Sequence, residues 1–178
     1  KNLNKLNFKN FSFLLKNNKI ILTFVALFVI FISYLLIPTF YNQNDLSKEL
    51  KNELQSKFDL NFKFSKNIKY NFFPKPHFII TNSKILNNKK EISKISKLKI
   101  FISFDDLFSL KNIATKDLIL ENANFHLNTE NYNFFIKLLD KNFKNGNLLI
   151  KNSNVFFRNS IDEVLFISNI FKMKYYFD

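Results

Sequence analysis

The side chains best able to do chemistry are few and scattered along this chain. Two histidines, His77 and His126, lie far apart, and neither has further metal ligands at a workable spacing. The pair Asp105-Asp106 precedes Leu107-Phe108, a pattern typical of the cap of a short helical turn; a carboxylate dyad for acid–base work is the alternative. A single glycine in 178 residues excludes glycine-rich phosphate loops and the elbow of serine hydrolases. We therefore expect no enzyme, no metal and no cofactor.

The net charge of +13 raises the question of a nucleic-acid partner. Almost all of the positive charge is lysine, because Arg158 is the only arginine, whereas proteins that read nucleic acids rely on arginine for bidentate contacts. We therefore expect no nucleic acid. A lysine-rich segment is interpreted as a solvated turn and outer strand face, with anionic lipid head groups as the alternative. Its lysines are Lys84, Lys89, Lys90, Lys94, Lys97 and Lys99.

The residues from Ile20 to Ile37 form an uncharged apolar run of eighteen residues. As a helix the run reaches roughly 27 Å, close to the ~30 Å hydrocarbon core of a bilayer. It is apolar all round, whereas a soluble core helix carries a polar stripe. A cleaved signal peptide is the alternative, but its apolar region is shorter and ends in small residues, and this run ends in the bulky Pro38–Tyr41. The run predicts an uncleaved transmembrane anchor over 20–37.

The charges around this run predict its orientation. Five lysines and no acidic residue precede the run, and nearly balanced charges follow it. Because excess lysine stays on the cytoplasmic side, residues 1–19 are predicted to be a cytoplasmic basic tail and 38–178 to lie across the membrane, in the periplasm of a bacterium. The chain starts at Lys1 rather than Met, and we expect it to be the amino-terminal piece of a longer protein.

An amphipathic helix is predicted over Asn44–Phe58. Either Asn44 or Asp45 can cap it, and one apolar stripe runs along it while lysine, glutamate and asparagine cover the other faces. The stripe consists of Leu46, Leu50, Leu54 and Phe58. We expect this stripe to pack on a sheet; a helix lying flat on the bilayer is the alternative.

After this helix, apolar residues alternate with polar ones at a period of two, in runs separated by polar turns. One example places Phe78 and Ile80 on one face and Ile79, Thr81 and Ser83 on the other. This pattern predicts an antiparallel β meander, interrupted by one short helix at Tyr132–Leu139. The predicted fold class is mainly β with α (α+β): an anchor, an amphipathic helix and a curved sheet or groove. Many of the strands are apolar on both faces, so we expect both faces to meet something apolar.

The order of these elements resembles the amino-terminal domain of the AsmA family. Phe73-Pro74 followed by Ile85-Leu86-Asn87 matches an aromatic-proline segment that leads into a strand, and 104–108 matches a short turn. The segment GNLLIKNSNVFFRNSIDEVLFISNI is similar to the closing strand pair of the family. Apolar positions between them also match: Ile113, Leu118, Leu120, Phe125 and Leu127. Ala123 stands where the family often has proline.

The resemblance implies an inner-membrane protein with a periplasmic β-rich domain that carries phospholipid between membranes and serves outer-membrane biogenesis. It implies phospholipid, the inner membrane and outer-membrane assembly proteins as partners. An anchored scaffold that recruits envelope assembly proteins through its sheet edges, without lipid passage, is the alternative. The residues expected to line an apolar groove are Leu98, Ile100, Ile102, Phe104, Leu118, Leu120, Phe125 and Leu127.

Overall fold

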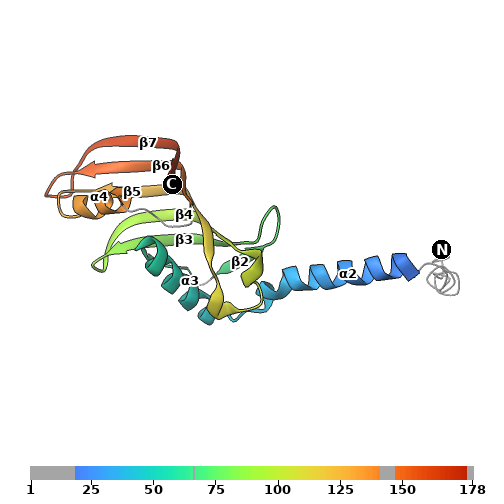
Figure 1. The fold of residues 1–178 in the computed structure, drawn as a ribbon. Coiled ribbons are helices and arrows are strands. Elements are labelled where there is room, and N and C mark those ends of the chain that lie inside the picture. The colour runs from blue at the N-terminus through green and yellow to red at the C-terminus, as the bar shows by residue number, and fades with distance from the viewer. Residues whose placement is uncertain (1–18, 66, 141–146, 176–178) are drawn as a thin grey trace, which may run out of the picture. The chain divides into compact units, whose positions relative to one another are not determined.

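The computed structural model describes residues 19–65, 67–140 and 147–175, so the predicted basic tail lies outside the described residues except for Lys19. The chain divides into two compact units, one ending at Leu36 and the other beginning at Ile37. The first unit contains helix α2. The second contains the remaining helices and all the described strands (Figure 1).

Helix α2, Lys19–Leu36, coincides with the predicted span to within one residue at each end. Together with the short helical turn η1, Ile37–Phe40, it is long and apolar enough to cross a membrane. Its apolar side chains are exposed along most of its length, unlike those of a core helix in a soluble protein.

Helix α3, Gln43–Phe58, begins one residue before the predicted helix and is capped by a different residue. The Asn42 side chain accepts hydrogen bonds from the backbone N–H groups of Asn44 and Asp45, at 2.9 and 3.4 Å, so Asn42 is the N-cap. Its apolar stripe is fully buried, which confirms that the stripe packs inside the domain and excludes a helix lying flat on the bilayer. At the other end, Asp59 adopts the left-handed conformation that commonly ends a helix.

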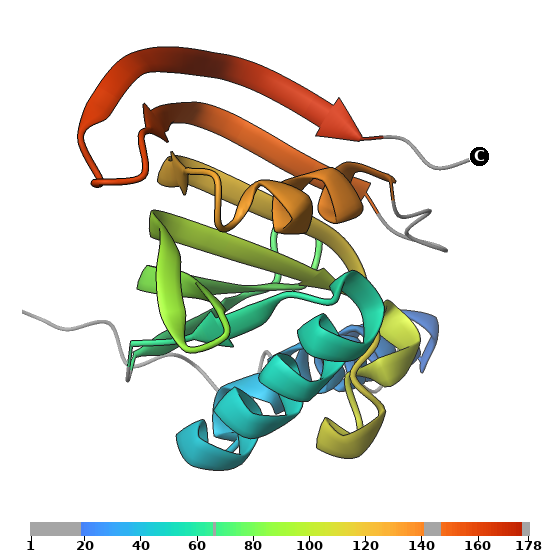
Figure 2. The ribbon, with the colours of Figure 1, turned by 90° about the vertical axis from the view of Figure 1, so that its left-hand side faces the viewer.

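The strands form one sheet in the order β1-β3-β4-β5-β6-β7, with β2 beside β1 on the same edge of β3. The long strands are β3 (His77–Asn87), β4 (Lys90–Ile102), β5 (Thr115–Leu127), β6 (Asn147–Arg158) and β7 (Val164–Tyr175). The short elements are β1 (Asn61–Lys63), β2 (Ile68–Asn71), η2 (Phe104–Asp106) and η3 (Leu110–Asn112). The sheet is curved (Figures 1 and 2). The predicted α+β class with a curved sheet is confirmed.

One pairing differs from the predicted antiparallel meander. Strands β5 and β6 run parallel, with Leu118 opposite Leu148, whereas the other pairings among the described strands are antiparallel. Helix α4, Tyr132–Asp140, lies in the connection between them and explains the difference. A parallel neighbour requires the chain to return to the end where the first strand began, and a helical crossover provides that return.

Three asparagines adopt the left-handed backbone conformation in the middle of strands. Asn82 on β3, Asn122 on β5 and Asn152 on β6 have φ angles of 55°, 54° and 46°. The register places them in one row across the sheet, with Ser96 between Asn82 and Asn122 on β4. Ser96 Oγ donates to Asn122 O at 3.0 Å. We call this row the crease. At the crease each strand carries one residue that interrupts the alternation of its side chains between the two faces of the sheet.

The crease reverses which residues of a strand face the helices. Ser83 was expected on the face opposite Phe78 and Ile80, but it is buried, as they are, because the left-handed residue between them turns the strand by one position. The same step occurs on the neighbouring strands. The buried residues that flank it there are Leu98 and Ile95, Leu120 and Ala123, and Ile150 and Ser153.

Helices α3 and α4 cover one side of the sheet, here called the helical face (Figure 2). Its central rows pair Phe78, Ile100, Leu118 and Leu148, and beside them Ile80, Leu98, Leu120 and Ile150. These side chains are buried and form the core. The other side, here called the open face, carries a mixture of apolar, lysine and carboxylate side chains.

Candidate functional site

A cavity of ≈ 350 Å³ lies on the helical face, between α4 and strands β5, β6 and β7. This volume is at the lower end of the roughly 300–1,000 Å³ of small-molecule sites in proteins. Its walls are apolar or aromatic. They comprise Phe125, Leu127, Tyr132, Phe135, Ile136, Leu148, Ile150, Val155, Phe157, Ile170 and Met173. With no charged side chain among these described residues, this cavity suits a hydrocarbon chain, and the phenol of Tyr132 is the one polar side-chain group among them.

Two asparagines fix the start of α4 and hence one wall of the cavity. Asn128 Oδ1 accepts from the Asn131 N–H at 3.0 Å, and Asn131 Oδ1 accepts from the Asn128 N–H at 2.9 Å. The buried Asn131 amide also donates to the His126 carbonyl at 2.7 Å. The helix that follows places Phe135 edge to face against Phe125, with ring centroids 6.2 Å apart. The end of β5 and the start of α4 are thus held together.

A second hollow of ≈ 360 Å³ adjoins the cavity. The two share Leu127, Tyr132 and Phe157 in their walls. The second hollow continues toward the turn between β6 and β7, where Phe157 and Phe166 stack with centroids 4.1 Å apart. Its remaining wall includes polar residues, so the combined cleft is apolar at one end and mixed at the other. Those remaining residues are Asn128, Thr129, Arg158 and Leu165.

The predicted groove residues fall into three groups. Five of them lie in the packed core, with at most 3 % of each side chain exposed: Leu98, Ile100, Ile102, Leu118 and Leu120. Phe125 and Leu127 line the cavity under α4. Phe104 lies at a different place, after the end of β4, and its side chain is exposed.

His126 lies behind the cavity wall, on the open face, where its ring stacks on Phe156 with centroids 5.3 Å apart. Arg158 Nε donates to His126 Nδ1 at 3.3 Å, so a neighbouring side chain satisfies this histidine. Burial lowers the pKa of the His126 imidazole below its ordinary value, and the adjacent guanidinium of Arg158 lowers that pKa further. Arg158 is held in turn by the Asp162 carbonyl at 2.6 Å.

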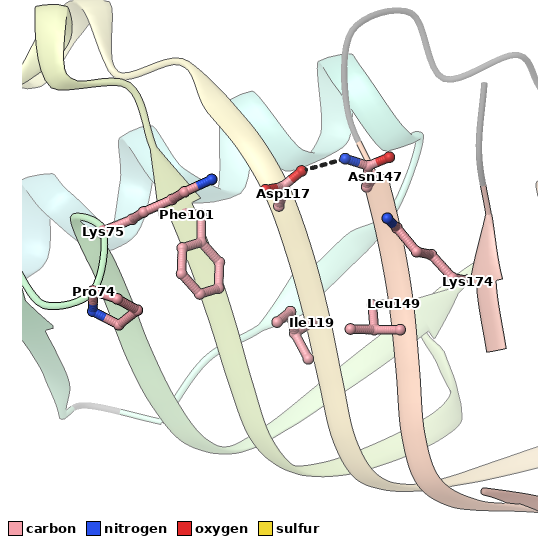
Figure 3. Close-up of a pocket in the computed structure, with 8 residues that line it drawn as sticks. All are labelled: Pro74, Lys75, Phe101, Asp117, Ile119, Asn147, Leu149 and Lys174. Carbon is pink, nitrogen blue, oxygen red and sulfur yellow. Dashed lines mark hydrogen bonds between the residues drawn. The ribbon is translucent and has the colours of Figure 1, made fainter. Parts of the chain in front are cut away.

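The open face has a cavity of its own, of ≈ 300 Å³, shown in Figure 3. Phe101, Ile119 and Leu149 form its floor, and Lys75 and Lys174 stand at its rim. Asp117 accepts a hydrogen bond from the Asn147 amide at 2.7 Å, so this carboxylate is engaged by its neighbour. The floor is apolar but the rim is charged, and nothing in the geometry singles out a reacting group.

The other residues considered for catalysis or metal binding belong to local structural contacts. His77 is buried, stacks on Phe101 and lies 2.8 Å from the Lys75 carbonyl through Nδ1. Asp105 and Asp106 lie within the turn η2 rather than at its cap, where Ser103 stands and donates to Asp105 at 3.3 Å. In the part of the chain that the structure describes, no group of three or more histidine or carboxylate side chains is placed to hold a metal.

Lysines of the basic segment pair with carboxylates along the sheet. Lys97 and Lys99 both approach Glu121, at 3.8 and 2.8 Å, and Lys84 and Lys94 approach Glu91. Lys90 binds Glu130 at 2.6 Å. These contacts favour the interpretation of a solvated outer face over that of a lipid head-group site.

Most of the cavity wall was not predicted as a site. The missed residues come from β6, β7 and α4, which reach the end of β5 only because β6 pairs parallel to it. One sequence signal was available: the phrases Thr81-Asn82-Ser83, Glu121-Asn122-Ala123 and Lys151-Asn152-Ser153 are similar. Each phrase contains the asparagine that lies in the crease on its strand. Matching the phrases therefore gives the register of β6 against β5.

No protein-family model matches this sequence, and a comparison with curated proteins finds no match. The resemblance to the AsmA family therefore rests on the hydrophobic spacing quoted above.

Proposed function

We propose that this chain is a membrane-anchored lipid-binding protein that holds an acyl chain in the cavity between α4 and strands β5, β6 and β7. The observation that carries the proposal is the cavity itself: ≈ 350 Å³ lined by apolar and aromatic side chains from two layers, adjoining a second hollow. An acyl chain placed there would make dispersion contacts with these walls and would remove their apolar surface from water.

The anchor supports this proposal. A helix long and apolar enough to span a bilayer leads directly into the domain, so the cavity is tethered to the membrane that the helix would span. The excess of lysine before the apolar run favours an amino end in the cytoplasm and a domain across the membrane. The resemblance to the AsmA family favours a bacterial inner membrane, a periplasmic domain and transport of phospholipid toward the outer membrane.

Photocrosslinking of the full chain tests the proposal. The chain is reconstituted in nanodiscs that contain a phosphatidylethanolamine with a diazirine in its acyl chain, irradiated, and digested for mass spectrometry. Peptides from α4, β6 and β7 should be labelled, and labelling of α2 provides the internal reference for lipid contact. Absence of label from the cavity peptides while α2 is labelled would overturn the proposal.

A matched pair of variants on α4 locates the site. Ile136 lines the cavity and is 42 % exposed, so Ile136→Asp should leave the fold intact; it should reduce the cavity label about tenfold because an ion facing acyl chains lacks solvation. Asn133→Asp introduces the same charge on an exposed position of α4 outside the cavity wall and should keep the label.

A scaffold function is the second candidate, and the edge strand β7 favours it. Among the described strands β7 is the last of the sheet, and its side chains are largely exposed on both faces, including Leu165, Phe166, Ile167 and Phe171. Such an edge can accept a strand from another protein. Unlabelled cavity peptides together with capture of an assembly protein along β7 would favour this function.

A further inference from the structure

Large aromatic side chains are exposed at one end of the domain, the end where β3, β5 and β6 begin. The most exposed are Phe40 at 86 %, Phe73 at 79 % and Phe108 at 74 %, and Phe72 and Phe104 are also exposed. Phenylalanine has no polar atom that favours water. A group of exposed rings therefore marks a surface that meets an apolar phase or partner.

Hydrogen bonds between three segments explain why these rings share one end. Tyr41, which directly follows Phe40, donates its hydroxyl to the Leu107 carbonyl at 2.6 Å. The N–H of Ile102, at the end of β4, donates to the Pro76 carbonyl at 3.1 Å, which ties the segment before Phe104 to the loop that carries Phe73. The turn η1, the loop between β2 and β3 and the segment 104–108 thus converge.

The chain itself indicates which apolar phase this end meets. Ile37, the first residue of the domain, directly follows the last residue of α2, and Phe40 is the last residue of the candidate span, Lys19–Phe40. A side chain so close to the end of a transmembrane helix lies at the level of the lipid head groups. Tyr41 also binds the carbonyl of Leu107, the neighbour of Phe108, so a membrane interface at Phe40 would lie close to Phe108 as well.

We infer that Phe40, Phe73 and Phe108 form an aromatic foot that inserts into the interface of the bilayer spanned by α2. This inference rests on the anchoring part of the proposed function and is independent of the acyl-chain cavity. The foot holds the domain against the membrane surface. We attribute the insertion to partition of the rings and not to charge, because the segments that carry the rings contain two aspartates, Asp105 and Asp106, and two lysines, Lys75 and Lys111.

The experiment uses the absence of tryptophan from this chain. Single tryptophans are introduced into the full chain by Phe108→Trp and, separately, Phe73→Trp, and each variant is reconstituted in vesicles of phosphatidylcholine brominated near the ester end of its acyl chains. The matched control is Ile161→Trp, because Ile161 is 71 % exposed but lies in the turn between β6 and β7, at the opposite end of the sheet. Phe28→Trp, within α2, reports anchoring.

We expect tryptophan at 108 and at 73 to be quenched at least about threefold more than tryptophan at 161, with the same result when part of the lipid is phosphatidylglycerol. Quenching at 28 combined with only control-level quenching at both 108 and 73 would overturn the foot and leave the anchor. No quenching at 28 would overturn the anchor and the foot together. Quenching at 108 and 73 only in vesicles with anionic lipid would overturn partition as the cause.

Discussion

Phe125 on β5 and Phe135 on α4 meet edge to face, with ring centroids 6.2 Å apart and ring planes at 83°. This contact joins the crossover helix to the sheet at the cavity wall. Because Phe135 is only part-buried, we expect Phe135→Ala to lower the free energy of unfolding by about 1–2 kcal/mol, less than the ~3–5 kcal/mol of a fully buried phenylalanine. Denaturant unfolding of the full chain in detergent measures the change.

Phe171→Ala is the matched control for this prediction. Phe171 is 84 % exposed on β7, and its truncation should change the free energy of unfolding by less than about 0.5 kcal/mol. Equal effects of the two substitutions would contradict the role of the aromatic contact.

Ile102 and Phe101 are neighbours on β4 that face opposite sides of the sheet. Ile102 is 3 % exposed, so Ile102→Asp should cost more than about 3 kcal/mol and prevent folding, since the carboxylate has no partner in the core. Phe101 lines the cavity of the open face beside Lys75, so Phe101→Asp should yield a folded protein with a lowered melting temperature. A folded Ile102→Asp chain that has lost bound lipid would instead place Ile102 in a lipid groove.

The crease across the sheet predicts a difference between alanine and glycine at Asn122. Its φ of 54° is accessible to asparagine and glycine but strained for alanine. Asn122→Ala should therefore lower the free energy of unfolding by about 1 kcal/mol or more, and Asn122→Gly by less than about half of that. Equal losses in chemical denaturation would show that the side chain, and not the backbone conformation, matters there.

His126 predicts a pH dependence of stability. Its pKa in the folded state lies below the ordinary value of 6.5, chiefly because of burial and further because of Arg158, so the unfolded state binds the proton more readily. Stability should therefore fall as the pH drops from above 6.5 toward the pKa of the folded state, and should change no further below that pKa. His126→Gln should lose this component.

Unfolding midpoints at pH 7.5 and 5.5, for the wild type and for His126→Gln, measure this effect. Carboxylates that titrate near pH 5 are the same in both proteins, so their contribution cancels in the comparison. A variant with the same loss between the two pH values as the wild type would contradict the assignment to His126.

Local patterns in the sequence were sufficient for several elements. The length and uniform apolar character of Ile20–Ile37 predict a helix without reference to any other residue, and α2 follows. The stripe of α3 was predicted at a spacing of four residues, and all its members are buried. The helix at Tyr132 and most strands follow from periodicity alone, because period 3.6 and period 2 are properties of the backbone conformation.

The direction of β6 and the composition of the cavity wall depended on the tertiary structure. Alternation of apolar residues is identical for parallel and antiparallel neighbours, so the sequence left the pairing of β5 with β6 undetermined. The left-handed residues Asn82, Asn122 and Asn152 each shift the alternation by one position, which moved Ser83 to the helical face against expectation. Leu98 lies in the packed core and Phe125 lines the cavity because of where α3 and α4 lie over the sheet. Contacts between segments distant in the sequence determine those positions.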